Sequence, residues 1–466
     1  MASPHHTLFD PFLSTQIASL VAWARWQNTE SLKVTVQGRL RDLLQSVQKH
    51  SPLYGRILKG RNLATLSLQD LPIMSKADLM AQFSDWVADP SLRLSDLRAF
   101  LNDPTQIGSA YQERYLLWES SGSNGEPGVF VQDARAMAVF DALEFWRRPN
   151  LQPLRRLRDP LGRRESIAFV GAIDGHYAGS VTLARLARLQ PAMASHLHRL
   201  SFMQPMEDLV AQLQACQPTV LATYPSLANL LMDEQDAGRL NIAPTEVWLG
   251  GESLNPSTQA RLQETWHSPF ANTYGCSEFL SLATSCTHGH LHLNHDWAIL
   301  ESVDDQGRPV PAGETGATTL LTNLCNHIQP IIRYDLGDRI TVRPEPCPCG
   351  SPFPVIEVQG RCSRNLYVEG GQHESIGLSP LALSTLLEES GLVQYQVHQA
   401  TPRKLTLRIP QHDADHALLA KRAATRLRAY LKQQGASHVS LGVQAGTPLF
   451  VSRSGKTPQF VHAGQT

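Results

Sequence analysis

The stretch that decides the fold class is residues 219–249, which read TVLATYPSLANLLMDEQDAGRLNIAPTEVWL. Two short apolar runs, 219–222 and 246–249, enclose a stretch at 226–238 with helical spacing of apolar residues. A similar apolar run occurs at 167–170. Short strands that alternate with longer helices are typical of parallel sheets with crossover helices. We therefore expect an α/β fold.

The flanking segments extend this prediction. Apolar residues up to about residue 85 recur at helical spacing, and from about residue 290 strand-like runs with turn signals predict a smaller β layer. The last hundred residues predict, in order, a helix at 379–389, strands at 393–398 and 403–409, a helix at 413–434 and a closing strand at 438–444. We expect a large α/β domain followed by a small α+β domain.

Composition narrows the class of function. The chain has 466 residues, 42% hydrophobic and 18% charged, as in ordinary globular enzymes. Its 41 Lys and Arg nearly balance 42 Asp and Glu, so no overall positive charge favours nucleic acid. Neither a leader nor an apolar run long enough for a bilayer is evident, so we expect a cytoplasmic protein without a membrane partner. Seven cysteines, an odd number, favour free thiols or metal ligands.

A loop rich in serine and glycine reads SSGSNGEPG at residues 120–128 and follows the apolar run 115–118. Such a loop offers hydroxyls and unhindered backbone N–H groups to a polyphosphate. It lacks the lysine of the P-loop. A loop of this composition is, on its own, more often a simple turn, so other segments must support a phosphate site.

Further segments follow this loop in a fixed order. They are Gly250-Gly251-Glu252-Ser253-Leu254, Tyr274-Gly275-Cys276-Ser277-Glu278, Arg333-Tyr334-Asp335-Leu336-Gly337-Asp338, Gly360-Arg361 and Ser454-Gly455-Lys456. Together they resemble the signatures of the adenylate-forming superfamily, which includes acyl-CoA synthetases, peptide-synthetase adenylation domains and luciferases. Within it, residues 71–79, 223–226 and 330–335 resemble the phenylacetate–CoA ligase branch, which handles aryl acids.

The resemblance implies roles for individual residues. It implies ATP binding by Ser120, Ser121, Gly122, Ser123, Gly251, Glu252, Tyr274, Asp338 and Arg361. It also implies that Glu278 helps to hold Mg²⁺ and that Lys456 bridges the reacting carboxylate and phosphate. Attack of a carboxylate on the α-phosphate develops charge on phosphoryl oxygens, which requires a cation and a metal-holding carboxylate. An isolated Asp or Lys is usually a turn or surface residue, and the ordered set favours the functional roles.

The family pattern also implies the division of the chain. We expect an N-terminal adenylate-forming domain at residues 1–361 and a mobile C-terminal domain at 362–466 that carries the catalytic Lys456. Two departures bear on this expectation. Glu126 stands where many relatives have a lysine, and Cys362 follows Gly360-Arg361 where an acidic hinge residue is usual.

A metal site is suggested by a tight thiolate pair. Cys347 and Cys349, with Cys286 and His292 upstream, supply four soft ligands of the kind that tetrahedral Zn²⁺ prefers. Four protein ligands leave no open position, so the zinc would be structural. The alternatives are reduced cysteines in a loop, or replacement of a ligand by one of His288, His290, His295 and Cys362.

Residues 169–179 resemble a segment that lines the aryl pocket in similar ligases. With it, the resemblance implies a substrate pocket formed by His176, Tyr177, Tyr224, Ser226, Asn272 and Gly275. A hydrogen bond from His176 or Tyr177 to a ring hydroxyl would favour a hydroxybenzoate over phenylacetate, although core packing explains both residues equally well.

The sequence thus predicts an ATP-dependent, AMP-forming aryl-acid ligase that transfers its acyl group to a thiol of coenzyme A or of an acyl carrier protein. Two alternatives remain at this point. One is a synthetase that adenylates a cofactor hydroxyl without forming a thioester, and the other is a non-catalytic nucleotide-binding regulator. Failure of every thiol to accept the product would favour the first, and acid-dependent pyrophosphate release would exclude the second.

Overall fold

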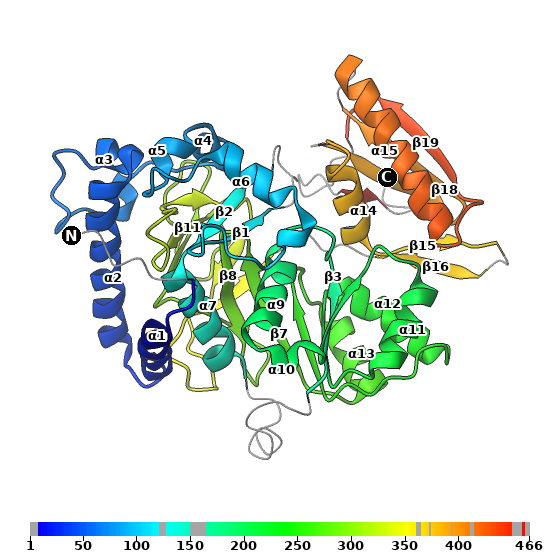
Figure 1. Cartoon of the computed structure of the whole chain (residues 1–466), viewed down its shortest axis with the longest axis horizontal. Helices are drawn as coiled ribbons and strands as arrows, with labels where there is room; N and C mark the ends of the chain where they lie inside the picture. Colours follow the sequence, from blue (N-terminus) through cyan, green and yellow to red (C-terminus); the bar gives the residue numbers. More distant parts are fainter. Residues whose placement is uncertain are drawn as a thin grey trace.

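The protein is seen in a computed structural model, which describes residues 8–120, 127–149, 165–359, 365–371, 374–392, 394–410, 414–449 and 459–461 (Figure 1). One large mixed sheet, several smaller sheets and surrounding helices make up these residues. The predicted α/β fold class is confirmed.

Nine strands form the largest sheet, in the order β13-β14-β9-β8-β7-β6-β5-β3-β4. Five of them are parallel, namely β4 (Leu197–Ser201), β3 (Ile167–Gly171), β5 (Val220–Thr223), β6 (Glu246–Gly250) and β7 (Phe270–Cys276). The other four continue it in antiparallel register, namely β8 (Phe279–Ser285), β9 (Leu291–Leu293), β14 (Val355–Val358) and β13 (Ile340–Val342). These antiparallel strands extend the parallel sheet, because β8 follows β7 through a short connection that needs no crossover helix.

The two faces of the parallel strands meet different surroundings. Helices α11 (Met206–Cys216), α12 (Pro225–Asp236) and α13 (Pro256–Trp266) share a buried apolar cluster with Val170, Leu221 and Val247. Because successive side chains of a strand point to opposite faces, Phe169, Ala222 and Trp248 face the other way. On that face α7 (Ala134–Arg147), α9 (Ala178–Leu189) and the short α10 (Pro191–Ala194) leave a cavity between themselves and the sheet.

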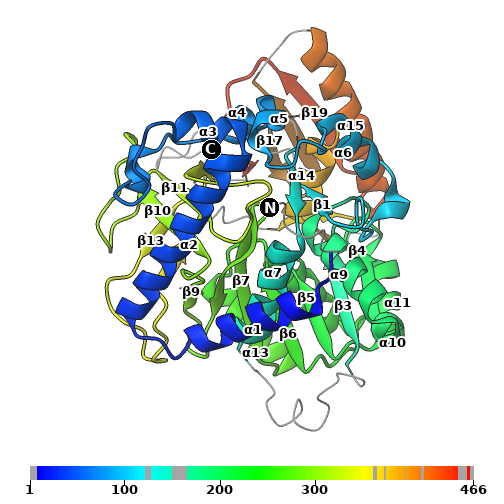
Figure 2. The same cartoon turned by 60° about the vertical axis from the view of Figure 1, so that its left-hand side comes forward.

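The expected N-terminal helices are present and cover one side of the molecule (Figures 1 and 2). They are α1 (Pro11–Ala24), α2 (Thr29–His50), α3 (Pro52–Ile57), α4 (Lys76–Ala81), α5 (Phe83–Trp86) and α6 (Leu94–Leu101). Asp10 and Asn28 cap the first two by accepting hydrogen bonds from backbone N–H groups. These helices share a core with α7 and with the antiparallel hairpin of β1 (Leu116–Glu119) and β2 (Val129–Gln132).

The predicted smaller β layer contains β10 (Ala298–Val303), β11 (Thr318–Asn323) and β12 (Tyr334–Asp335). It is tied to the N-terminal helices by the backbone of Met74, which donates to Arg333 O and accepts from Asp335 N. These bonds fix the start of α4 beside β12.

The C-terminal elements lie above the edge of the large sheet (Figure 1). A hairpin of β15 (Leu366–Glu369) and β16 (Ser375–Leu378) precedes α14 (Pro380–Glu388), and a four-stranded sheet in the order β19-β18-β17-β20 packs with α15 (Ala414–Gln433). Its strands are β17 (Gln396–Thr401), β18 (Lys404–Ile409), β19 (Ser440–Ala445) and β20 (Phe460–Val461). Bounds differ from the expected ones by at most three residues, and β20 was not expected.

Apolar residues of this C-terminal region share a buried cluster with helices of the large sheet. Gly377 lies so close to α12 that an added Cβ would come within 2.1 Å of a Leu230 methyl carbon. The division of the chain near residue 361 stays a prediction, because residues 360–364 lie outside the described ranges. None of the described helices has the length and apolar character needed to cross a bilayer.

Candidate active site

The candidate site lies at the carboxyl ends of the parallel strands, where open α/β sheets bind their ligands. Strands β5, β6 and β7 end at Thr223, Gly250 and Cys276. Each continues into one of the predicted motifs. One cavity of about 2250 Å³ runs from this edge along the sheet face that α7 and α9 cover.

Tyr274 and Asp338 come together in this cavity although 64 residues separate them. The Tyr274 hydroxyl donates to Asp338 Oδ2 at 2.7 Å. Burial, reinforced by the Asp338 carboxylate, raises the pKa of Tyr274, so the hydroxyl remains a donor. Just before Asp338, the Gly337 N–H donates to Asp335 Oδ1 at 2.9 Å, and the left-handed Gly337, at φ +69°, turns the chain towards the cavity.

Glu278 is the buried acid of the site, with 8% of its surface exposed. Its backbone carbonyl accepts from Asn323 Nδ2 at 3.0 Å, and the preceding carbonyl of Ser277 accepts from Trp118 Nε1 at 2.8 Å. Burial raises the pKa of Glu278, while a hydrogen bond from Tyr334 and the charge of Lys76 act in the opposite direction. Burial makes the charged form of this carboxylate costly unless a cation balances it.

The ends of the serine and glycine loop are fixed by the β1–β2 hairpin. The Gly128 N–H donates to Ser120 Oγ at 3.0 Å, and the Ser120 N–H donates to Gly128 O at 2.9 Å. Five predicted residues, Ser121, Gly122, Ser123, Arg361 and Lys456, lie outside the described ranges.

Gly251 and Glu252 form the turn after β6 and line the cavity. Gly251 has φ +74°, and an added Cβ would lie 2.8 Å from the Tyr224 ring, so a side chain does not fit there. Glu252 accepts from the Ser226 N–H at 2.8 Å and from Ser226 Oγ at 2.9 Å, which ties this turn to the start of α12. Burial raises the pKa of Glu252.

The predicted substrate residues divide into two groups. Tyr177, Tyr224, Asn272 and Gly275 line the cavity. Ser226 is instead bonded to Glu252, and His176, only 1% exposed, contacts Asp103 O at 3.0 Å and packs against Phe100. The structure therefore places His176 and Ser226 behind the cavity wall, where they support its lining.

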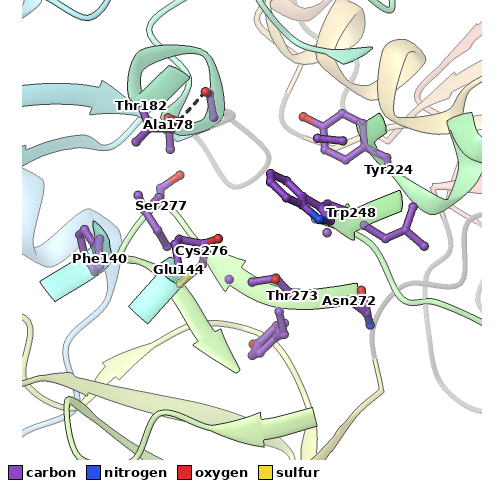
Figure 3. A pocket seen from close by; sticks show the side chains of 18 of the residues that line it. Phe140, Glu144, Ala178, Thr182, Tyr224, Trp248, Asn272, Thr273, Cys276 and Ser277 are labelled. Atoms are coloured by element: carbon purple, nitrogen blue, oxygen red, sulfur yellow. Dashed lines mark hydrogen bonds between the residues drawn. The ribbon is translucent and has the colours of Figure 1, made fainter. Parts of the chain in front are cut away.

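The cavity also contains residues that the sequence did not single out. Figure 3 shows Trp248 and Tyr224 on one side of the pocket and Phe140, Glu144 and Cys276 across from them. Burial raises the pKa of the Cys276 thiol, so it stays protonated. The alternation of side chains along β6 could have predicted the place of Trp248, because it puts this ring on the face opposite to the buried Val247.

A second polar feature of the pocket is Asn272, which lies beside Thr273 in Figure 3. Its Oδ1 is buried and finds no hydrogen-bond donor in the described part of the chain. Buried acceptors are normally paired, so this atom is available to a donor group of a bound ligand.

The four predicted metal ligands come together at one end of the large sheet. Donor atoms of Cys286, His292, Cys347 and Cys349 lie within 4.8 Å of one another. The Sγ atoms of Cys286 and Cys347 are 3.8 Å apart, which matches the spacing of about 3.8 Å that tetrahedral Zn–S bonds of about 2.3 Å impose. Cys349 Sγ lies 3.3 Å from His292 Nε2. The donor set fits a zinc ion.

The surroundings orient these ligands. His292 Nδ1 donates to Phe353 O at 2.8 Å, which leaves Nε2 as the free lone pair that faces the thiols. Arg343 Nη1 lies 3.2 Å from His290 Nε2, and since arginine can only donate, His290 must carry its proton on Nδ1. That Nδ1 lies 3.3 Å from Cys347 Sγ. His290, a possible substitute ligand, is thus placed as a hydrogen-bond donor to the sulfur.

These contacts also set the charge of the thiols. Burial alone would raise the pKa of Cys347, but hydrogen bonds from the Cys349 backbone and from His290 outweigh it and lower the pKa to about 5. Burial and the neighbouring Cys347 raise the pKa of Cys349 to about 11. Cys347 therefore loses its proton readily, whereas a thiolate at Cys349 requires a cation to balance the second negative charge.

Part of this chain is similar to a known protein family. The model of the AMP-binding enzyme family matches residues 170–319, which run from β3 into β11 and include Gly251, Tyr274 and Glu278. The chain carries an AMP-binding domain over these residues. The motif order found in the sequence agrees with this assignment.

Solved structures extend the likeness beyond the matched region. A 2-hydroxyisobutyryl-CoA ligase in complex with its acyl-AMP and CoA, in the thioesterification state, is 19% identical over 94% of this chain and 91% of its own, with a TM-score of 0.58. The same ligase in the postadenylation state is 20% identical over 92% and 89%, with a TM-score of 0.51. At this identity the likeness shows the fold. The search of curated proteins gives no match.

Proposed function

We propose that this protein is an AMP-forming ligase that activates an aromatic carboxylic acid and transfers its acyl group to a thiol. In the first step a carboxylate oxygen bonds to the α-phosphorus of ATP, and the bond from that phosphorus to the bridging oxygen breaks to release pyrophosphate. In the second step the thiolate attacks the acyl carbon and AMP leaves. The observation that supports this most strongly is the Tyr274–Asp338 pair, which shares one cavity with Glu278 and Ser120.

The charges of the site suit these steps. Asp338 would accept hydrogen bonds from both ribose hydroxyls, and the backbone beside Ser120 would bind the polyphosphate. Glu278 would hold Mg²⁺, which neutralises phosphate oxygens when it is bound. By the motif order, Arg361 and Lys456 complete the site, and residues 362–466 form the domain that delivers Lys456.

The acid is proposed to be aromatic because Tyr224, Trp248 and Phe140 present flat apolar surfaces to the cavity. The unpaired Asn272 Oδ1 offers an acceptor at the same wall, which suits a ligand with a donor group. A hydroxybenzoate therefore fits better than phenylacetate. The proposed acceptor is the thiol of coenzyme A or of a carrier-protein phosphopantetheine arm, and we propose that the enzyme is cytoplasmic.

We further propose that Cys286, His292, Cys347 and Cys349 bind one structural zinc ion. The ion would join the β8–β9 connection to the loop before β14 and has no part in the reaction, because its four ligands leave no open position.

Pyrophosphate release tests the proposed reaction. Purified protein would be incubated with ATP and Mg²⁺ and with each of a set of hydroxybenzoates, benzoates, phenylacetates and 2-hydroxyisobutyrate. We expect release that depends on an aromatic acid and that falls at least about 100-fold in Lys456→Ala. Lys421→Ala, which changes an exposed lysine of α15, is the matched control. Release with 2-hydroxyisobutyrate alone would refute the aromatic acid, and no release with any acid would refute acyl activation.

A further inference from the structure

Lys76 is a cavity-lining cation to which the family motifs assign no role. It is the first residue of α4, and its neighbour Ser75 caps this helix through a reciprocal pair of hydrogen bonds with Asp78. The backbone bonds of Met74 to Arg333 and Asp335 tie the start of the helix to β12. The backbone of Lys76 is therefore fixed relative to the strand that leads to the nucleotide site.

The Lys76 side chain runs along the end of the serine and glycine loop. A Cβ built on Gly128 would lie 3.2 Å from Lys76 Cδ, and Gly128 is the residue whose N–H bonds to Ser120. Lys76 therefore lies beside Gly128 and lines the same cavity as Ser120.

No direct contact with a described residue neutralises the charge of Lys76. Its amine forms no ion pair and no hydrogen bond within the described ranges. Burial lowers the pKa of Lys76, and the carboxylates of Glu278 and Glu388 act against this from a greater distance. A partly desolvated ammonium without a partner favours an anionic ligand.

The loop itself carries Glu126 and no lysine, although pyrophosphate gains negative charge as it leaves. We infer that Lys76 binds the β- and γ-phosphates of ATP and supplies the positive charge that the loop does not provide. This inference rests on the proposed function, because it concerns the same ATP site. Lys76 would then contact the leaving pyrophosphate, whereas the α-phosphate, which stays in the acyl-adenylate and in AMP, lies beyond it.

Nucleotide binding separates this role from a structural one. The affinities of wild type, Lys76→Gln and Lys76→Arg for Mg-ATP and for AMP would be measured by calorimetry, with Lys49→Gln as an exposed control. Loss of one charge-assisted contact should weaken ATP binding about 10- to 100-fold in Lys76→Gln and leave AMP binding within about twofold. Lys76→Arg should recover most of the ATP affinity. Equal weakening of both nucleotides, or unchanged ATP binding, would overturn the inference.

The two half-reactions give a second readout. Lys76→Gln should slow pyrophosphate release while thioester formation from a synthetic acyl-adenylate keeps its rate. A slowed second step would overturn the assignment of Lys76 to the leaving phosphates. Because ATP binding needs no acid, a wild-type protein that binds ATP through Lys76 but releases no pyrophosphate would refute the proposed function and leave this inference standing.

Discussion

The hydroxyl of Tyr274 donates a hydrogen bond of 2.7 Å to Oδ2 of Asp338 and so joins the end of β7 to the segment after β12. The bond orients the carboxylate, and its other oxygen, which has no hydrogen-bond donor in the described part of the chain, can bind a ligand. Tyr274→Phe should therefore raise the KM for ATP about 10-fold and leave the KM for the acid nearly unchanged, since a hydrogen bond to a charged group contributes about 1.5–3 kcal/mol. Steady-state kinetics at varied ATP checks this.

The matched control is Tyr367→Phe, because that hydroxyl donates to Asp233 at 3.0 Å on the surface. We expect wild-type kinetics in the control. A KM for ATP unaltered in Tyr274→Phe would mean that Asp338 needs no help to bind the nucleotide.

Removal of one thiol should abolish zinc binding. In Cys349→Ser we expect the zinc content to fall from about one ion per chain to nearly none, and the free energy of unfolding to fall by more than about 4 kcal/mol because a buried metal cluster is lost. Elemental analysis and urea unfolding measure the two effects. Cys216→Ser, far from the cluster in sequence and half-buried, should keep its zinc. Purified wild type without zinc would argue for reduced thiols instead.

Arg333 should contribute strongly to stability because it is only 4% exposed and connects separate parts of the chain. Its guanidinium bonds to Glu301 at 3.2 Å and to Leu71 O at 2.8 Å. Arg333→Met would leave the largely buried carboxylate of Glu301 unpaired, at a cost of about 3 kcal/mol in urea unfolding. Arg308→Met, which breaks the exposed pair with Asp304, should change stability by less than about 1 kcal/mol. Similar losses in both variants would be evidence against the buried connection.

The fold was readable where local pattern and packing agree. The apolar runs 219–222 and 246–249 became β5 and β6, and the stretch 226–238 became α12, because each presents one apolar face to the same core. The four clustered metal donors could also be predicted, since cysteine and histidine at close spacing are easily recognised in a sequence. The inferred role of Lys76 could not be predicted, because its position beside Gly128 arises only when α4 packs on β12.

The sequence also could not predict which side chains of the pocket wall face the cavity. His176 and Tyr177 are adjacent in sequence, and the chain turns His176 towards Asp103 while Tyr177 faces the cavity and donates to Glu389. Amino-acid composition does not predict which of two adjacent side chains faces the cavity. The sequence pattern likewise could not predict that β8 pairs with β7 in antiparallel register, because apolar runs alone do not specify which strands pair.

Acid should destabilise the protein through His327. Burial and the nearby Arg135 guanidinium lower the pKa of His327 to about 4, below the usual value of about 6.5. The unfolded chain therefore binds a proton first, and stability falls as the pH drops from about 6.5 to about 4. His327→Gln should remove about 3 kcal/mol of that fall, as measured by urea unfolding across this range. An exposed change, His50→Gln, should leave the slope as in wild type, and the same slope in His327→Gln would contradict the assignment.

Acid-dependent exchange of labelled pyrophosphate into ATP tests the central claim most directly, because it requires reversible formation of an acyl-adenylate and no thiol. The account predicts exchange that appears with a hydroxybenzoate, needs Mg²⁺ and is lost in Asp338→Ala. Exchange that ignores the acid, or that is absent with every acid while ATP still binds, would contradict it.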